Sequence, residues 1–245
     1  MKKITCYLLV MLFCAGLLVG CGSNGGDDSL SFDFDLHDGD GWEGGFTDLP
    51  VNYETDNYEL FFGPAPLPAE LGSAKKGLML QGHNRSDDLF MFISRQLGKA
   101  DGLKPDTVYL VEIVVDFVTN VPAGLMGIGG SPGEALFVKV GAAGEKPAAV
   151  AVGEGDQAYY QLSVDKGAQS EAGRYTRVVG DIAKEGSSED DENYIMKSLD
   201  NKGDAIEVTT DSSGNLWIFV GTDSGFEGRT TLYYTAVQVT LTAKA

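Results

Sequence analysis

Short runs of alternating apolar and polar residues follow one another along most of the chain, separated by Gly, Pro, Asn and Asp. This pattern is typical of β-strands joined by turns, because successive side chains of a strand point to opposite faces. Long segments with the 3.6-residue period of an amphipathic helix do not interleave with these runs. The pattern predicts strands over residues 31–36, 58–62, 77–81, 88–94, 108–119, 135–140, 159–164, 205–210, 215–222 and 232–242.

The longest run, residues 108–119, shows the alternation most clearly. Its apolar side chains, from Tyr109 to Phe117 at every second position, share one face, whereas Glu112 and Asp116 lie on the other. We expect the first face to pack in a core and the second to meet water or a ligand.

Two further runs, residues 88–94 and 215–220, are apolar on both faces, which predicts central strands whose outer face is also covered. A helix is predicted over residues 189–199, because Ser188 can cap it, acidic residues follow at its positive end, and Ile195 and Leu199 share a face. The fold class predicted is therefore all-β: an antiparallel jelly-roll β-sandwich with one or two short helices.

The first twenty residues differ from the rest in composition. Lys2 and Lys3 precede an apolar run over residues 7–19, which is typical of a signal peptide and too short for a membrane-spanning helix. The segment that ends this run, Leu18-Val19-Gly20-Cys21, resembles the lipobox of bacterial lipoproteins. The resemblance implies that Cys21 carries lipid, palmitate included, and that Gly22, in place of an aspartate, directs the lipoprotein to the cell outer membrane.

Residues 1–20 are thus predicted to be a signal peptide, residues 21–29 a lipidated flexible tether, and residues 30–245 a single β-sandwich domain. The three cysteines all lie at or before Cys21, so the domain has no disulfide, thiolate metal site or cysteine nucleophile. A formal net charge of −18 argues against nucleic acid as a partner. We expect the chain to meet the membrane through its lipid anchor alone, on a periplasmic or surface face that the sequence leaves open.

Three segments of the domain resemble the galactose-binding-like jelly roll, a fold common among carbohydrate-binding modules. They are Phe32-Asp33-Phe34-Asp35 with Asp38-Gly39-Asp40-Gly41-Trp42, then residues 102–109 before the longest strand, and finally residues 232–237. The resemblance implies a β-sandwich that binds a carbohydrate or an envelope glycan without catalysis. Two alternatives stay open: a structural or assembly protein of the cell envelope that acts through protein contacts, and a glycoside-cleaving enzyme.

Catalytic candidates are few. The sequence has only two histidines, His37 and His83, and the G-x-S-x-G match at residues 129–133 is followed by a strand-like run instead of the helix that a nucleophile elbow needs. Glu112 and Asp116 are the carboxylate pair considered for glycoside cleavage, but their spacing along a strand places them ~13 Å apart. No catalytic residue is therefore predicted.

The first strand contains a candidate metal site. Asp33, Asp35 and Asp38 offer the hard oxygen ligands that calcium prefers, and the resemblance implies a structural calcium near the first and last strands. The alternative is that these carboxylates are the solvated face of the strand. No other cofactor is predicted.

Three polar loops, residues 41–48, 82–88 and 222–229, combine aromatic, amide, acidic and arginine side chains. Carbohydrate recognition uses this mixture, with rings against the sugar face and charged groups on the hydroxyls. The alternative is that the arginines pair locally with carboxylates and that the tryptophan closes the end of the sandwich. The candidate ligand-binding residues are Trp42, Asn84, Arg85, Asp87, Asp223, Glu227 and Arg229.

Overall fold

The computed structural model describes residues 29–72 and 75–244. The predicted signal peptide, the lipobox with Cys21 and all but the last residue of the predicted tether lie outside the described residues, and Ser29 already begins the first strand. Among the residues that are described, no helix is long and apolar enough to cross a membrane.

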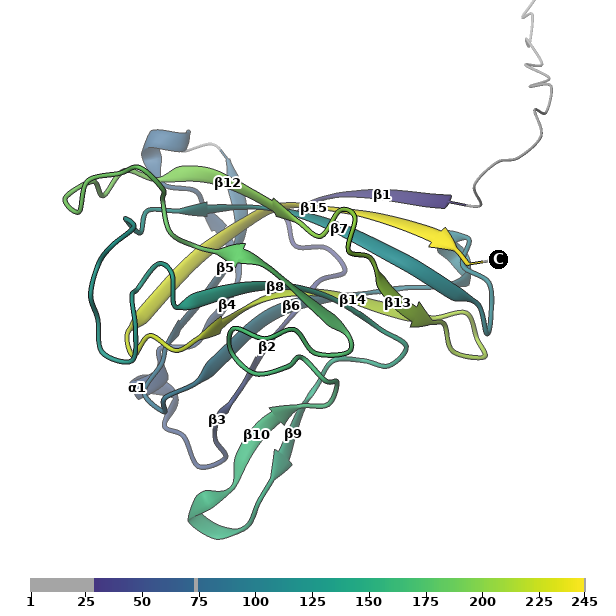
Figure 1. Ribbon diagram of the computed structural model, residues 1–245, viewed down its shortest axis with the longest axis horizontal. Helices are drawn as coiled ribbons and strands as arrows, with labels where there is room; N and C mark the ends of the chain where they lie inside the picture. Colours follow the sequence, from purple (N-terminus) through teal and green to yellow (C-terminus); the bar gives the residue numbers. More distant parts are fainter. Residues whose placement is uncertain (1–28, 73–74, 245) are drawn as a thin grey trace, which may run out of the picture.

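Strands dominate the described chain, as the alternating pattern predicts (Figure 1). One helix, α1, is a single turn, and three 3-10 turns cover Ala69–Leu71, Lys99–Asp101 and Gly155–Gln157. The elements are β1 (Ser29–Asp35), β2 (Glu43–Thr47), β3 (Leu49–Pro50), α1 (Thr55–Tyr58), β4 (Phe61–Pro66), β5 (Lys76–His83), β6 (Leu89–Leu97), β7 (Val108–Thr119), β8 (Leu136–Ala143), β9 (Ala149–Val152), β10 (Tyr159–Leu162), β11 (Thr176–Asp181), β12 (Ile195–Asp200), β13 (Ile206–Thr209), β14 (Leu216–Ser224) and β15 (Arg229–Ala243).

Two antiparallel sheets form the sandwich. The first has the order β12-β7-β15-β5-β4. Two further strands pair at its edges: β13 follows β12 end to end along β7, and β1 follows β5 end to end along β15. The second has the order β11-β8-β14-β6-β2. A small third sheet, β3-β10-β9, projects from the body in Figure 1. The predicted all-β antiparallel sandwich with a short helix is confirmed.

The core lies between the two large sheets. From β7 it receives the apolar face predicted for the longest strand, with Tyr109 and Phe117 at most 2% exposed, and Glu112 and Asp116 lie on the outer face as expected. β6 and β14 are central strands, also as predicted. Their outer apolar side chains, Phe90, Phe92 and Phe219 among them, pack under a second cluster that includes Leu162, Val164 and Tyr175. The chain itself therefore covers most of these faces, and Trp217 near the start of β14 stays partly exposed.

The helix predicted over residues 189–199 is wrong. Residues from Ile195 form β12, which pairs with the edge of β7 from Thr119 to Val114. The pairing supplies backbone hydrogen-bond partners over six residues, and tertiary pairing of this kind outweighs a weak local helix preference.

The loop predicted over residues 41–48 is largely a strand, β2, paired with β6. Its two glycines allow close packing, because a Cβ at Gly44 would meet the ring of Phe62 and one at Gly45 would meet the ring of Phe92. The glycine-rich residues 124–134 form a tight connection into β8, with positive φ at Gly124, Gly129 and Gly130.

Candidate functional site

A groove opens where two strands meet end to end along β15. β5 pairs with β15 from Arg229 to Tyr234, and β1 pairs with the same edge from Ala236 to Thr242. A β-bulge between these segments leaves Thr235 at the seam, where its Oγ1 donates to the backbone oxygen of Asp116 at 3.2 Å. The end of β1, the start of β5, the β4–β5 connection and β12 border this seam. They enclose about 710 Å³, and the lining residues are Asp35, His37, Asp38, Leu67, Leu71, Lys75, Lys76, Met196 and Thr235.

His37 links two carboxylates at one side of the groove. Its Nδ1 lies 2.9 Å from Asp35 Oδ1, and its Nε2 lies 2.8 Å from Asp38 Oδ2. The hydrogen bond with Asp35, together with the charges of Asp35 and Asp38, raises the pKa of His37. The hydrogen bonds from the His37 side chain and backbone lower the pKa of Asp35. All three side chains are more than half exposed, so their remaining hydrogen-bonding sites face solvent.

The rest of the groove combines apolar and cationic groups. Leu67, Leu71 and Met196 contribute apolar surface, and Met196 is 51% exposed. Lys75 and Lys76 line the same space, and neither ammonium has a hydrogen bond or ion pair with another described residue. Ligand sites commonly have volumes of about 300 to 1,000 Å³ and pair an apolar wall with a few polar groups.

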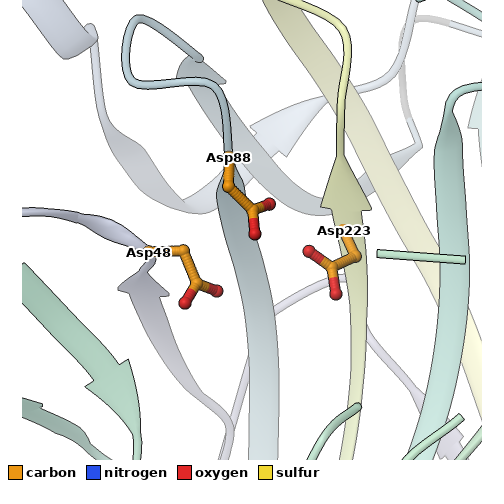
Figure 2. A group of neighbouring side chains, drawn as sticks. All are labelled: Asp48, Asp88 and Asp223. Atoms are coloured by element: carbon orange, nitrogen blue, oxygen red, sulfur yellow. The ribbon is translucent and has the colours of Figure 1, made fainter. Parts of the chain in front are cut away.

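A second cluster forms where the three predicted polar loops meet. Each contributes one aspartate: Asp48 follows β2, Asp88 precedes β6, and Asp223 lies near the end of β14 (Figure 2). One oxygen from each carboxyl lies within 4.8 Å of the others. We call this cluster, with the two lysines described next, the aspartate junction.

Lys139 and Lys166 neutralise much of the negative charge in the aspartate junction. The Lys139 ammonium lies 2.8 Å from Asp223 Oδ2, with both side chains fully buried. The Lys166 ammonium lies 2.7 Å from the same oxygen and 3.1 Å from Asp48 Oδ2. Lys139 also donates to three backbone oxygens, those of Lys166, Ala168 and Glu171, at 3.0 to 3.2 Å. The segment 166–171 therefore folds around a fixed ammonium, much as a loop folds around a metal ion.

Burial and charge shift the proton affinities in the aspartate junction. Burial raises the pKa of Asp48, against the opposing effect of Lys166. Burial also raises the pKa of Asp88 to about 8, with a further increase from the charge of Asp223. Burial lowers the pKa of Lys139. Burial acts in the same direction on Lys166, but the charges of Asp223 and Asp48 outweigh it and raise the pKa of Lys166.

The aspartate junction is a poor metal site despite its three carboxylates. Two ammonium groups already contact Asp223 Oδ2, and a divalent ion held by the three carboxylates would be repelled by both at close range. A small cavity of about 240 Å³ lies beside it, lined by Asp48, Ser86, Asp88, Asp156 and Tyr159 with their neighbours Leu49, Pro50, Gln157 and Ala158.

Three of the seven predicted ligand-binding residues are buried and make structural contacts. Trp42 is 6% exposed and packs edge-on against Phe34 in the core, which agrees with the alternative that it closes the sandwich. Asn84 is buried and donates to the backbone oxygen of Ser224 at 3.0 Å, which ties two of the polar loops together. Asp223 is the buried centre of the aspartate junction and reaches no solvent.

The remaining predicted residues lie on the surface. Arg85 donates to the backbone oxygen of Asn57 at 2.7 Å, and Arg229 lies 3.4 Å from Glu59 Oε2. Both arginines thus contact the segment 57–59, and neither pairs with a described carboxylate of the three polar loops. Asp87 adopts a left-handed backbone with φ 73°, and its backbone oxygen accepts a hydrogen bond from the Gln169 side chain. Glu227 is exposed, and its backbone NH donates to Ile128.

The carboxylates proposed for calcium do not form a compact ligand set. Asp33 is exposed on β1 opposite Gln238, while Asp35 and Asp38 are engaged by His37. Within residues 29–72 and 75–244, the aspartate junction is the one group of three such ligands close enough to hold a metal. Calcium at Asp33, Asp35 and Asp38 therefore stays a prediction without support from this geometry.

Several residues that matter at these sites were not singled out from the sequence. Lys139 was the detectable one, because a lysine inside the apolar strand Leu-Phe-Val-Lys-Val requires a buried counter-charge. The groove residues Leu67, Leu71, Lys76 and Met196 come from three segments, the β4–β5 connection, β5 and β12, and share no local motif.

No family model and no curated protein sequence matches the chain. Solved structures of similar shape include TmCBM61 in complex with β-1,4-galactotriose, at 9% identity over 83% of this chain and 90% of that one, with a TM-score of 0.36. A CBM22-1 xylan-binding domain from Paenibacillus barcinonensis has 15% sequence identity over 88% of this chain and 95% of that one, with a TM-score of 0.37. The mannan-recognising module TmCBM27 has 10% sequence identity over 89% of this chain and 99% of that one, with a TM-score of 0.36. At these scores the likeness carries no conclusion about a ligand, which has to be argued from the site itself.

Proposed function

We propose that the chain is a carbohydrate-binding protein without catalytic activity, and that its ligand lies in the groove at the seam between β1 and β5. The observation that carries the proposal is the composition of this groove: exposed hydrogen-bonding groups and apolar side chains line the same space of about 710 Å³. A sugar ring has hydroxyls at its rim and a face of C–H groups, so it complements both kinds of lining group at once.

The roles of the groove residues follow from their chemistry. Asp35 and Asp38 accept hydrogen bonds from hydroxyls through the lone pairs that His37 leaves free. Leu67, Leu71 and Met196 contact the C–H face. The ammonium groups of Lys75 and Lys76 donate to ring hydroxyls or to the carboxylate of an acidic sugar.

A direct test measures binding of the purified protein to β-1,4-galactan, xylan, mannan and polygalacturonate by isothermal titration calorimetry. We expect binding to at least one of them at millimolar concentration or below, and loss of that binding in Met196→Glu. Met126→Glu is the matched control, because Met126 is 98% exposed and lies outside the groove. Absence of binding across the panel, or equal loss in both variants, would contradict the proposal.

We also propose that lipid on Cys21 fixes this binding domain to the outer membrane. Support comes from the lipobox-like segment that ends in Cys21 and from the Gly22 that follows it. Metabolic labelling with palmitate, followed by membrane fractionation, is the test. The native chain should take up label and fractionate with the outer membrane, whereas Cys21→Ser should be unlabelled; equal labelling of both would refute the anchor.

A further inference from the structure

The aspartate junction leaves two buried carboxyl oxygens without a donor. Asp88 Oδ1 and Asp223 Oδ1 are both inaccessible to solvent, and neither accepts a hydrogen bond from a described residue. The two carboxyl groups point toward each other in Figure 2. A buried acceptor with no donor destabilises the folded state, and two facing carboxylates repel each other as well.

The charge balance of the aspartate junction points to one bound proton as the missing donor. Three carboxylates meet two ammonium groups, so the fully ionised cluster would hold one uncompensated negative charge beside the fully buried Asp223. One added proton would neutralise the cluster. Placed between Asp88 and Asp223, it would also supply the hydrogen bond that both Oδ1 atoms lack.

We propose that Asp88 and Asp223 share one buried proton, and that its release loosens the joint between the loops 41–48, 82–88 and 222–229. Asp88 is the protonated partner, because both ammonium groups form ion pairs with Asp223 and neither forms one with Asp88. The shared proton stabilises the contacts between the three loops while it is bound. Its site shares no residue with the carbohydrate groove.

The other groups around Asp88 set the direction of the effect. Burial and the charges of Asp223 and Asp48 hold the proton on Asp88, whereas Lys166 and Lys139 favour its loss, and the first set prevails: the pKa of Asp88 is about 8. Asp156 lines the adjoining cavity and adds a further negative charge nearby.

The sign of the pH dependence follows from the unfolded state. An unfolded aspartic acid loses its proton at about pH 4. Between pH values of about 4 and about 8 the folded state binds the extra proton. This contribution to stability is therefore complete below about pH 4 and is lost as the pH rises through about 8.

Release of the proton has a local consequence in the loop that contains Asp88. The Ser86 hydroxyl in this loop lies 3.3 Å from the backbone oxygen of Asp48 and 3.0 Å from that of Asp88, and the Asn84 side chain donates to the backbone oxygen of Ser224. Repulsion between Asp88 and Asp223 would strain the two contacts that join the loops. We therefore expect amide hydrogens at residues 84–88 to exchange faster above about pH 8 than the rise in intrinsic exchange explains.

The test follows the carboxyl carbons of ¹³C-aspartate-labelled protein by NMR between about pH 3 and about pH 10, in the native chain and in Asp88→Asn. One aspartate should titrate at about pH 8 in the native chain, and this titration should be missing in the variant. The side-chain amide introduced by this substitution donates permanently to Asp223. The melting temperature of the variant should therefore fall less between about pH 5 and about pH 9 than that of the native chain.

Asp87→Asn is the matched control. Asp87 is the exposed neighbour, and asparagine tolerates the left-handed backbone it adopts. This variant should keep both the high-pH titration and the native dependence of melting temperature on pH. An Asp88 carboxyl that titrates at about pH 4, or an Asp88→Asn variant with the native pH dependence, would overturn the proposal. The NMR result stands whatever the variant's stability, because the titration is read on the native chain.

Discussion

The groove and the aspartate junction contain the same residue types, but these residues are exposed in the groove and buried in the aspartate junction. Both combine aspartates with lysines. In the aspartate junction the lysines are buried and saturated by carboxylate and backbone oxygens, so the charges hold separate segments together. In the groove Asp35, His37 and Asp38 are exposed, and the ammonium groups of Lys75 and Lys76 have no partner among the described residues. Burial and partner number, more than residue type, separate a structural cluster from a binding surface.

The largest expected difference between the two regions is in stability. Asp223→Ala would leave two buried ammonium groups without their shared carboxylate, and loss of one partner of a buried pair costs about 3 to 5 kcal/mol. Asp38→Ala removes an exposed contact and should cost less than about 1 kcal/mol. Urea unfolding of the two variants measures both values. Equal costs would mean that the aspartate junction does not hold the loops together.

A smaller effect should appear in ligand affinity. Here a substitution in the groove should matter more than one in the aspartate junction, the reverse of their effects on stability. Lys76→Glu places a negative charge in the groove and should weaken binding of polygalacturonate about tenfold or more, which corresponds to about 1.4 kcal/mol. The melting temperature should stay within a few degrees of the native value. Lys202→Glu makes the same charge change at an exposed site outside the groove and is the control. Calorimetric titration compares the affinities of the two variants. Similar losses of affinity would mean that the net charge of the protein, and not a specific site in the groove, governs binding.

The smallest expected effect is the pH dependence of that binding. Because the contacts with Asp35 and Asp38 raise the pKa of His37, the imidazole carries its positive charge to a higher pH than a free histidine does. Affinity for polygalacturonate should therefore be highest below this pKa and fall a few-fold as the pH rises through it. His37→Gln should flatten the profile. A native profile that rises with pH would contradict the role given to His37.

The sequence predicted the sandwich because strand alternation is local. The run over residues 108–119 indicated both its strand and its buried face, and both are present in β7. The sequence predicts a helix where β12 lies because Ser188 and the acidic residues after it resemble a helix start, whereas the pairing that makes this segment a strand comes from β7. It predicts a loop where β2 lies because the glycines of this strand are explained only by the rings of Phe62 and Phe92, which pack against them.

The sites were harder to predict than the fold, because their residues meet only in three dimensions. Asp223 was selected as a candidate ligand contact, but its partners Lys139 and Lys166 are 84 and 57 residues away in sequence, and no local pattern indicates that they bury it. The groove depends on β1 ending where β5 begins along β15, which is a property of strand register. Asp35 and Asp38 were recognised as a possible oxygen site, but for a metal and without His37.

Chemical-shift mapping tests the central claim most directly. The ¹⁵N-labelled protein is titrated with fragments of whichever polysaccharide of the panel it binds, and every described amide reports its own environment. The account predicts that shifts concentrate at His37, Lys76, Met196 and Thr235, while Asp88, Tyr159 and Asp223 stay unchanged. Shifts that concentrate around Asp48, Asp88 and Tyr159 instead would place the ligand in the small cavity beside the aspartate junction and contradict the assignment of the groove.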